Sequence, residues 1–391
     1  MSEVPYVAEL GLTYKTLAEL SAETWAVRSD RGVEVLHFRE GLAMLEDKQL
    51  EKGASFQKRL DDLGITDGQA RDDWDRMLVT TEGEARRALR RPLTQLLAGP
   101  QMRRLEAVIR QIVDEALDEI DDPTDVDLMK ELAWKIPPRV YCHLVAAPMD
   151  EAPVVAQLSD RVLAPILTGN RERKQDSIDA FYETLDFVKG HLRERRASGL
   201  GEDFASIMLR QQDSGLQTEE ELYFEGIALL QASVDNTVHQ IGMMLGTLFE
   251  EPSRWDRVVQ DPGLVTVAAE ESMRLTPRFN TIFRYARHAA DFNGLAIPAD
   301  TWVYLSIRAA NRDAGVFADP NAFRFDRGVS RTLQFGGGPY NCLGQILARV
   351  ELQAVLHALR ERFPASRLTE AWSQHETNAV NEVESLRAAL R

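Results

Sequence analysis

Cysteine is scarce in this chain, and its scarcity excludes several kinds of site. The 391 residues contain only two cysteines, Cys142 and Cys342, and neither belongs to a Cys-x-x-Cys pair. Zinc sites and iron–sulfur clusters need several thiolates at close spacing, and two distant cysteines do not make a disulfide framework. A cysteine that takes part in metal chemistry here therefore acts as a single thiolate.

Long apolar runs are also absent, as are the features of a targeting segment. No stretch of about 18 apolar residues occurs, so the sequence predicts no membrane-spanning helix. The first residues, Met-Ser-Glu-Val-Pro-Tyr, include neither a basic nor an apolar region of the kind that begins a secretory signal. We expect a cytoplasmic protein without a membrane partner.

Positive charge is in the minority. The 62 Asp and Glu residues outnumber the 46 Lys and Arg residues and give a net charge of −16 at pH 7. An acidic chain is a poor general partner for nucleic acid, whose phosphates are bound by clustered cations. The sequence also lacks the glycine fingerprint of flavin- and nicotinamide-binding folds, so it predicts no bound flavin or nicotinamide cofactor.

The apolar spacing predicts a mainly α fold with small β-sheets. From residue 101 to 260 the pattern is almost entirely helical, with one helix expected over Met102–Glu119 and the longest over Glu219–Glu250. Short β-like runs lie within residues 1–60, hairpins are expected near residues 279–305, and residues 53–80 are interpreted as polar and irregular. Because no repeat or low-complexity linker occurs, we expect a single domain over residues 1–391.

The ten residues 335–344, Phe-Gly-Gly-Gly-Pro-Tyr-Asn-Cys-Leu-Gly, are the most informative stretch. Gly336 and Gly338 allow positive φ and a close approach of the backbone. Backbone N–H groups of such a loop can stabilise the negative charge of the Cys342 thiolate and tune a metal bound to it. A thiolate can bind one iron where a porphyrin supplies the in-plane ligands.

This stretch resembles the haem-binding loop of the cytochrome P-450 superfamily, Phe-Gly-x-Gly-x-(His or Arg)-x-Cys-x-Gly. Phe335, Gly336, Cys342 and Gly344 match it together with Gly338, whereas Tyr340 replaces the usual base. The resemblance covers nearly the whole chain and implies the fold of that family, with haem b between a long central helix and the Cys loop. It makes the Cys342 thiolate the axial ligand of the iron.

The resemblance also assigns charged residues around the haem. Arg86 and Arg90 are four apart and share a helix face, where two guanidinium groups suit the haem propionates. Arg284 is implied as a third propionate ligand. Glu271 and Arg274 form the family's Glu-x-x-Arg pair, although this spacing alone is most often a surface ion pair.

The middle of the long helix corresponds to the family's oxygen-binding segment, Ala-Gly-x-(Asp or Glu)-Thr-(Thr or Ser). Aligned with it are Ala232, Ser233, Asp235, Asn236 and Thr237. Ser233 replaces the usual glycine, and Asn236 replaces the threonine that helps to deliver protons. An amide does not relay protons as a hydroxyl does, so two alternatives stay open: oxidation without oxygen insertion, or ordinary hydroxylation with Asn236 ordering water.

The resemblance places further residues near the substrate, with surface loop or local core as the alternative for several of them. They are Gln57, Trp74, Leu78, Ala232, Ser233, Phe279, Asn280, Ile282 and, in a last hairpin over residues 378–383, Val380. This polar and aromatic set suggests an aromatic, amide-bearing natural product, such as a cyclodipeptide (diketopiperazine) or small peptide that is coupled or hydroxylated.

The expected function is thus a haem-thiolate monooxygenase or oxidase of secondary metabolism that uses a separate ferredoxin and ferredoxin reductase. The alternatives are a hydroxylase of terpenes or polyketides, a peroxide-using enzyme or isomerase that needs no redox partner, and a non-catalytic haem sensor.

Overall fold

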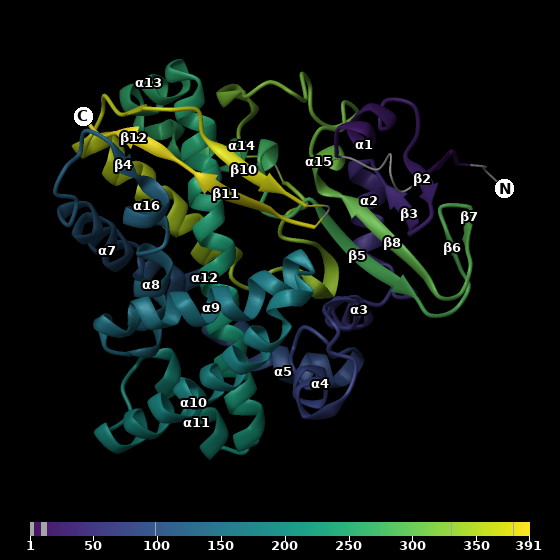
Figure 1. Cartoon of the computed structure of the whole chain (residues 1–391), viewed down its shortest axis with the longest axis horizontal. Helices are drawn as coiled ribbons and strands as arrows, with labels where there is room; N and C mark the ends of the chain where they lie inside the picture. The colour runs from purple at the N-terminus through teal and green to yellow at the C-terminus, as the bar shows by residue number, and fades with distance from the viewer. Residues whose placement is uncertain (1–3, 9–13, 98, 330, 378) are drawn as a thin grey trace. The chain divides into compact units, whose positions relative to one another are not determined.

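The computed structural model describes the chain except for residues 1–3, 9–13, 98, 330 and 378 (Figure 1). The chain divides into two compact units, each assembled from segments that are distant in sequence. Unit 1 comprises residues 1–55, 243–342 and 373–384, and unit 2 comprises residues 56–242, 343–372 and 385–391. Helices predominate and the strands are short, which confirms the predicted fold class. The single domain over residues 1–391 stays a prediction.

Unit 1 is built around a five-stranded sheet in the order β1-β2-β3-β8-β5. Its strands are β1 (Tyr6–Val7), β2 (Ala26–Ser29), β3 (Gly32–Val35), β5 (Thr281–Ala286) and β8 (Thr301–Ser306). β3 runs parallel to β8 with Val33 opposite Val303, while β5 and β8 are antiparallel. Gly32 has a φ of +145°, and a Cβ there would lie 2.1 Å from the carbonyl oxygen of Trp302, so the turn between β2 and β3 needs glycine.

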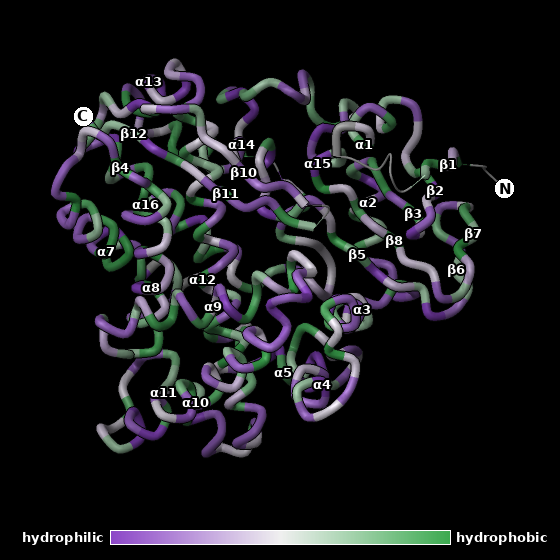
Figure 2. Tube along the Cα trace, in the orientation of Figure 1, coloured by the Kyte–Doolittle hydropathy of each residue, from purple (hydrophilic) through white to green (hydrophobic). Residues whose placement is uncertain are grey.

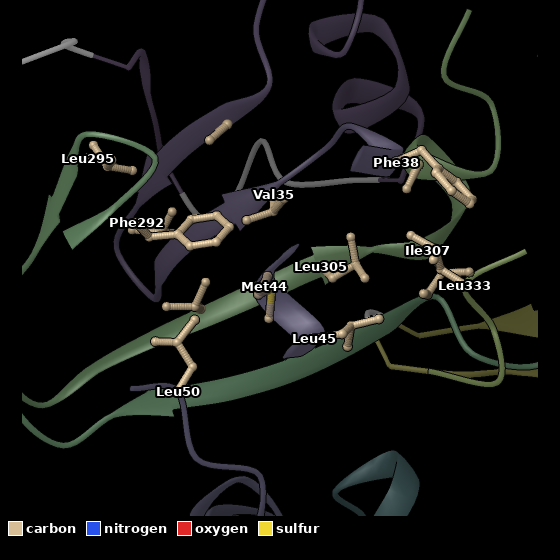
Figure 3. Close-up of a cluster of buried hydrophobic side chains, with 14 of the residues drawn as sticks. Val35, Phe38, Met44, Leu45, Leu50, Phe292, Leu295, Leu305, Ile307 and Leu333 are labelled. Carbon is tan, nitrogen blue, oxygen red and sulfur yellow. The ribbon is translucent and has the colours of Figure 1, made fainter. Parts of the chain in front are cut away.

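Apolar side chains on one face of this sheet form the core of unit 1 (Figure 3). Val35 and Leu305 come from neighbouring strands, and Met44 and Leu45 come from helix α2 (Phe38–Glu46). All four are completely buried. The core thus joins the N-terminal segment to strands almost 270 residues later, which fixes the segment that precedes the Cys loop.

The other elements of unit 1 are short helices and hairpins. The helices are α1 (Tyr14–Leu20), α13 (Pro252–Gln260), α14 (Val265–Leu275) and α15 (Ile307–Ala310). The hairpins are β6 (Ala290–Phe292) with β7 (Leu295–Ile297), and β10 (Ser373–Glu376) with β11 (Asn381–Ser385).

Unit 2 consists mainly of helices whose apolar positions recur along their length, as the green segments of α7 and α16 show in Figure 2. In chain order its helices are α3 (Gly53–Leu63), α4 (Gly68–Asp75), α5 (Gly83–Leu96), α6 (Gly99–Arg104), α7 (Glu106–Asp118), α8 (Ile136–Val145), α9 (Ala152–Thr168), α10 (Lys174–Ser198), α11 (Phe204–Asp213) and α16 (Gln345–Arg362). A small sheet of β4 (Val126–Asp127), β12 (Arg387–Ala389) and β9 (Arg367–Leu368) accompanies them.

The longest helix, α12 (Glu219–Glu250), has the bounds that its apolar pattern predicts. Residues up to 242 belong to unit 2 and later residues belong to unit 1. Most of its side chains are buried, in agreement with apolar residues on nearly all of its faces.

Two sequence-based interpretations need correction. Residues 53–80 are not irregular, because they form α3 and α4. The glycines that suggested loops stand at the helix ends: Gly53 and Gly68 begin the helices, and Gly64 follows α3 with a φ of +90°. The helix expected over Met102–Glu119 is instead α6 and α7, separated at Leu105.

Candidate active site

The Cys loop of unit 1 is closed on itself by backbone hydrogen bonds. The N–H of Cys342 donates to the carbonyl oxygen of Phe335 at 2.8 Å, and the N–H of Gly336 donates to that of Leu333 at 2.8 Å. Gly336 and Gly338 have φ values of +71° and +60°. A Cβ at Gly338 would lie 3.0 Å from the carbonyl oxygen of Leu45, so both conformation and space favour glycine there.

The loop presents the side chain of Cys342, which is exposed, whereas Cys142 is buried in α8. Burial raises the pKa of the Cys142 thiol to about 12, so this cysteine stays protonated and inert. An accessible sulfur on a glycine-shaped loop fits a thiolate ligand of haem iron. Gly344 is the residue immediately before α16.

Arg284 and Tyr340 form the second part of this site. Arg284 is 1% exposed, and its guanidinium carbon lies 5.0 Å from the centre of the Tyr340 ring. Arg284 also donates a hydrogen bond to the carbonyl oxygen of Phe283 at 3.1 Å. A guanidinium stays charged when buried, so the site favours an anionic group, and a haem carboxylate fits that requirement.

Glu271 and Arg274 make a buried, bidentate ion pair in α14. Arg274 Nε and Nη2 each donate to a carboxylate oxygen of Glu271 at 2.8 Å, and the two side chains are 1% and 3% exposed. Arg327 Nε contributes a third bond at 3.1 Å. Burial by itself raises the pKa of a carboxyl, but the hydrogen bonds from the arginines outweigh it and leave the pKa of Glu271 lowered.

Arg274 also holds the segment that leads toward the Cys loop. Its guanidinium donates to the backbone oxygens of Asn311, Pro320 and Ala322 at 2.8, 2.6 and 3.0 Å. The ion pair is therefore a structural tie rather than the surface pair that is the default for this spacing.

Arg86 and Arg90 lie one turn apart on α5 in unit 2. Arg86 is 5% exposed and donates a hydrogen bond to the carbonyl oxygen of Leu78, while Arg90 is half-buried. The intervening Arg87 is exposed, as is Arg91. The helix thus separates two inward guanidinium groups from two outward ones, as a spacing of four predicts.

The middle of α12 has an open stripe in an otherwise buried helix. Ala232 is exposed, and Ala228, Ser233 and Asn236 are half-buried. Residues 228, 232 and 236 recur every four positions and so share one face. Small side chains on an accessible face leave room for a ligand beside the helix. The side-chain oxygen of Asn236 has no hydrogen-bond partner among the described residues.

Asp235 and Thr237 point into more enclosed surroundings. Asp235 is fully buried, and its carboxylate lies 3.9 Å from the imidazole Nε2 of His239 one turn later. Thr237 is 6% exposed. The His239 ring packs edge-on against Trp134 with 5.8 Å between ring centres. A titratable pair, Asp235 and His239, therefore sits directly beside the open stripe.

Two of the residues predicted to line the pocket are used inside unit 2. Trp74 is fully buried between Phe56 and Phe181, at ring-centre distances of 5.4 and 5.0 Å, so it is a core residue. The amide of Gln57 donates to Asp75 at 3.0 Å. The sequence pattern does not predict α3 and α4, and contacts made by these helices engage the side chains of both Trp74 and Gln57. Leu78, which follows α4, is half-buried.

The pocket residues expected around β5 lie together in unit 1. Phe279 is half-buried and pairs with Val380 in an antiparallel bridge, whereas Val380 is completely buried and so, like Trp74, is a core residue. Ile282 is half-buried on β5. Asn280 does not offer its amide to a ligand, because both N–H groups bond to Thr377 and Asn381. Asn378, within the predicted last hairpin, lies outside the described residues.

Sequence reasoning missed Arg327, His239 and Asn381. Arg327 and Asn381 reach partners 56 and 101 positions away, which no local spacing rule reveals. His239 could have been found, since it stands four residues after Asp235 on a predicted helix.

None of the helices in the described part of the chain combines the length and apolar character needed to cross a bilayer. A family model described as Cytochrome P450 matches residues 142–383. The chain is 28% identical to luteothin monooxygenase of Streptomyces thioluteus, over 88% of this chain and 85% of the relative. It is 34% identical to 6-deoxyerythronolide B hydroxylase of Saccharopolyspora erythraea, over 68% and 65% of the two chains.

A third relative is nocardicin C N-oxygenase of Nocardia uniformis subsp. tsuyamanensis, 31% identical over 72% of this chain and 70% of the relative. Among solved structures, the crystal structure of CalO2 superposes with a TM-score of 0.88 at 26% identity, covering 97% of this chain and 96% of the other.

Proposed function

The chain belongs to the cytochrome P450 family and is a haem-thiolate monooxygenase, and from this premise we propose that it oxidises a bacterial secondary metabolite with Cys342 as the ligand of the haem iron. The observation that carries the assignment is the exposed Cys342 sulfur on a loop that needs glycine at positions 336 and 338. A thiolate-bound haem supplies the activation of dioxygen, and the thiolate favours cleavage of the O–O bond.

The arginines bind the haem propionates. Buried Arg284 supplies one charge, and Tyr340 packs against it and offers a neutral hydroxyl in place of the family's base. Arg86 and Arg90, which share the inward side of α5, supply the others. Phe335 and Gly344 shape the two ends of the Cys loop.

Proton management falls to residues 235–237. Asp235, buried beside His239, places a carboxyl group near the open stripe of α12. Asn236 orders water there through its amide, with the hydroxyl of Thr237 one residue away. Because an amide does not pass protons along as a hydroxyl does, slow proton delivery favours oxidation that removes hydrogen without inserting oxygen. Ordinary hydroxylation is the second outcome, and relatives named as a hydroxylase and an N-oxygenase favour it.

The substrate is a small secondary metabolite. Relatives named for luteothin, nocardicin C and 6-deoxyerythronolide B support this class. The candidate lining residues with accessible side chains are Phe279 and Ile282 in unit 1, and Leu78, Ala232 and Ser233 in unit 2. An aromatic cyclodipeptide (diketopiperazine) or peptide is a narrower candidate. Its support is weaker now that Trp74, Gln57 and Asn280 make contacts within the protein.

Electrons come from a ferredoxin and its reductase, since the sequence has no flavin-binding or nicotinamide-binding fingerprint of its own. Turnover with peroxide alone and without reduced ferredoxin would instead identify the partner-independent alternative. Cytoplasmic location stays a prediction.

The test is the optical spectrum of the purified protein, reduced and exposed to carbon monoxide. Wild type should give the band typical of a thiolate ligand, and Cys342→His should retain haem but lose that band. Cys142→Ser is the matched control and should leave the band unchanged. An unaltered band in the Cys342→His protein would contradict the assignment. Titration with a panel of polyketides and aromatic cyclodipeptides then identifies the substrate class by displacement of the iron-bound water.

A further inference from the structure

Asn280 and Asn381 form a reciprocal amide pair in unit 1. Asn280 directly precedes β5, and Asn381 is the first residue of β11. The Nδ2 of each residue donates to the Oδ1 of the other, at 2.7 and 2.8 Å. The two residues are only 4% and 1% exposed. Two strands that are 101 positions apart are thus joined through matched side chains.

The remaining N–H groups of the two amides are also used. Asn280 Nδ2 donates to the carbonyl oxygen of Thr377 at 2.7 Å, and Asn381 Nδ2 donates to that of Pro277 at 2.7 Å. With every side-chain N–H engaged, neither amide can rotate without losing hydrogen bonds in a buried place. A fully satisfied buried network of this kind fixes one arrangement of the groups that it joins.

Backbone bonds align the same two segments. The N–H of Asn280 donates to the carbonyl oxygen of Ala379 at 2.9 Å, and the N–H of Asn381 donates to that of Arg278 at 2.8 Å. Phe279 and Val380 lie between these bonds and face each other in an antiparallel bridge. The hydroxyl oxygen of Thr377 accepts from the N–H of Val380 at 2.9 Å and closes the tip of the hairpin.

We propose that Asn280 and Asn381 are positioning residues that hold Phe279, packed against the fully buried Val380, as a rigid wall of the substrate pocket. This inference rests on the proposed function, which places the Phe279 side chain beside the substrate. The pair acts through its neighbours, because its own donors are already engaged. Ligands large enough to reach the wall are therefore selected by a preformed surface, while ligands confined to the iron are not affected by it.

The experiment compares Asn280→Leu, Asn381→Leu and the double variant with wild type and with Gln374→Leu. Gln374 is the matched control, since its amide lies on β10 of the same hairpin but donates to Glu376 within that hairpin. Hydrogen exchange is followed by mass spectrometry in peptides covering residues 277–282 and 377–383. Binding of imidazole and of the larger 4-phenylimidazole is followed by optical titration.

A positioning role gives a specific combination of results. Exchange in the two peptides becomes at least tenfold faster in the single and double leucine variants, while β8 is unchanged. The Kd of 4-phenylimidazole shifts at least fivefold, while that of imidazole stays within twofold. Gln374→Leu behaves as wild type in both measurements. The double variant regains thermal stability relative to the single variants, because no amide is left unpaired, but it does not regain the ligand selectivity.

The proposal is overturned if exchange in the two peptides is unchanged, or if both ligands shift by the same factor. It is equally overturned if the double variant recovers wild-type ligand selectivity, since the pair would then contribute to core stability without positioning the pocket wall. If the leucine variants fail to fold, Asn381→Asp is used instead, because it keeps the shape of the side chain. Its carboxylate still accepts a hydrogen bond from Asn280 but places an oxygen opposite the carbonyl oxygen of Pro277. The same pattern of exchange and ligand selectivity is expected for this variant. Failure of the proposed function is distinguishable, because it removes the thiolate-type band and leaves the exchange result intact.

Discussion

The guanidinium carbon of Arg284 lies 5.0 Å from the centre of the Tyr340 ring, and Arg284 is almost completely buried. Tyr340 occupies the position where the family's haem-binding loop usually has a base. The ring therefore contributes attraction to the arginine without adding a second positive charge beside it.

Two substitutions of Tyr340 distinguish the contribution of its aromatic ring from that of its hydroxyl. Tyr340→Phe keeps the cation–π contact and should change the free energy of unfolding by less than about 0.5 kcal/mol, whereas Tyr340→Leu should cost about 1–2 kcal/mol. Thermal unfolding measures both, and transfer of haem to apomyoglobin measures how firmly the variants keep it. Equal losses for Phe and Leu would show that the hydroxyl matters rather than the ring.

Glu271 is bound by the buried Arg274 and by Arg327, whose side chain is 9% exposed, so replacing the Glu271 carboxylate by a neutral group should lower stability. Glu271→Gln leaves Arg274 and Arg327 without their shared carboxylate, and breaking a buried pair in this way typically costs about 3–5 kcal/mol. Denaturation by urea should show this loss together with a lower haem content. Asp326→Asn is the matched control, since Asp326 is 69% exposed in its pair with Arg324 and should change stability little.

The parts that the sequence predicts best have strong local signals. The bounds of α12 follow from a long apolar pattern that begins after three acidic residues and stops before Pro252. The Cys loop follows from a dense pattern of glycine and cysteine, and the short strands of unit 1 follow from alternation such as that at Val33 and Val35. In each case one stretch of chain contains the information.

The features that the sequence does not predict depend on residues far apart in the chain, or lie in helices whose apolar pattern is weak. The amide pair of Asn280 and Asn381 arises only when β5 and β11 come together. The sequences of α3 and α4 are mostly polar, so the pattern does not predict them as helices. Their stability comes from buried Leu60 and Trp74 and from ion pairs such as Arg71 with Asp75. Trp74 therefore looks available for a ligand until its packing partners are known.

Glu225 gives the protein a predictable dependence on pH. Burial in α12, reinforced by the charge of Glu221, raises its pKa from the ordinary value of 4.5 to about 8. Between these values the unfolded chain releases the proton while the folded protein keeps it, so the contribution of Glu225 to stability falls as pH rises from 4.5 to 8 and then levels off. The limiting slope is about 1.4 kcal/mol per pH unit.

The variant Glu225→Gln does not titrate and should be more stable than wild type at pH 8.5, with a difference that shrinks toward pH 5. Urea denaturation at several pH values measures the difference. Glu202→Gln is the control, because the Glu202 side chain is 98% exposed and should show no such trend. A constant difference across this range would contradict a raised pKa at Glu225.

Asn236 should limit how well electron flow is coupled to oxidation of the substrate. It stands on the open stripe of α12 where the family usually has threonine, and its side-chain oxygen is without a partner among the described residues. Asn236→Thr restores a hydroxyl one residue from Asp235 and should lower the peroxide released per reduced nicotinamide consumed, by about threefold or more, because a hydroxyl can both accept and pass on a proton. Asn236→Ala should raise peroxide release, since it removes the group that orders water. Thr237→Val is the matched control: if Thr237 rather than Asn236 manages protons, this variant will have the large effect and Asn236→Thr will have none.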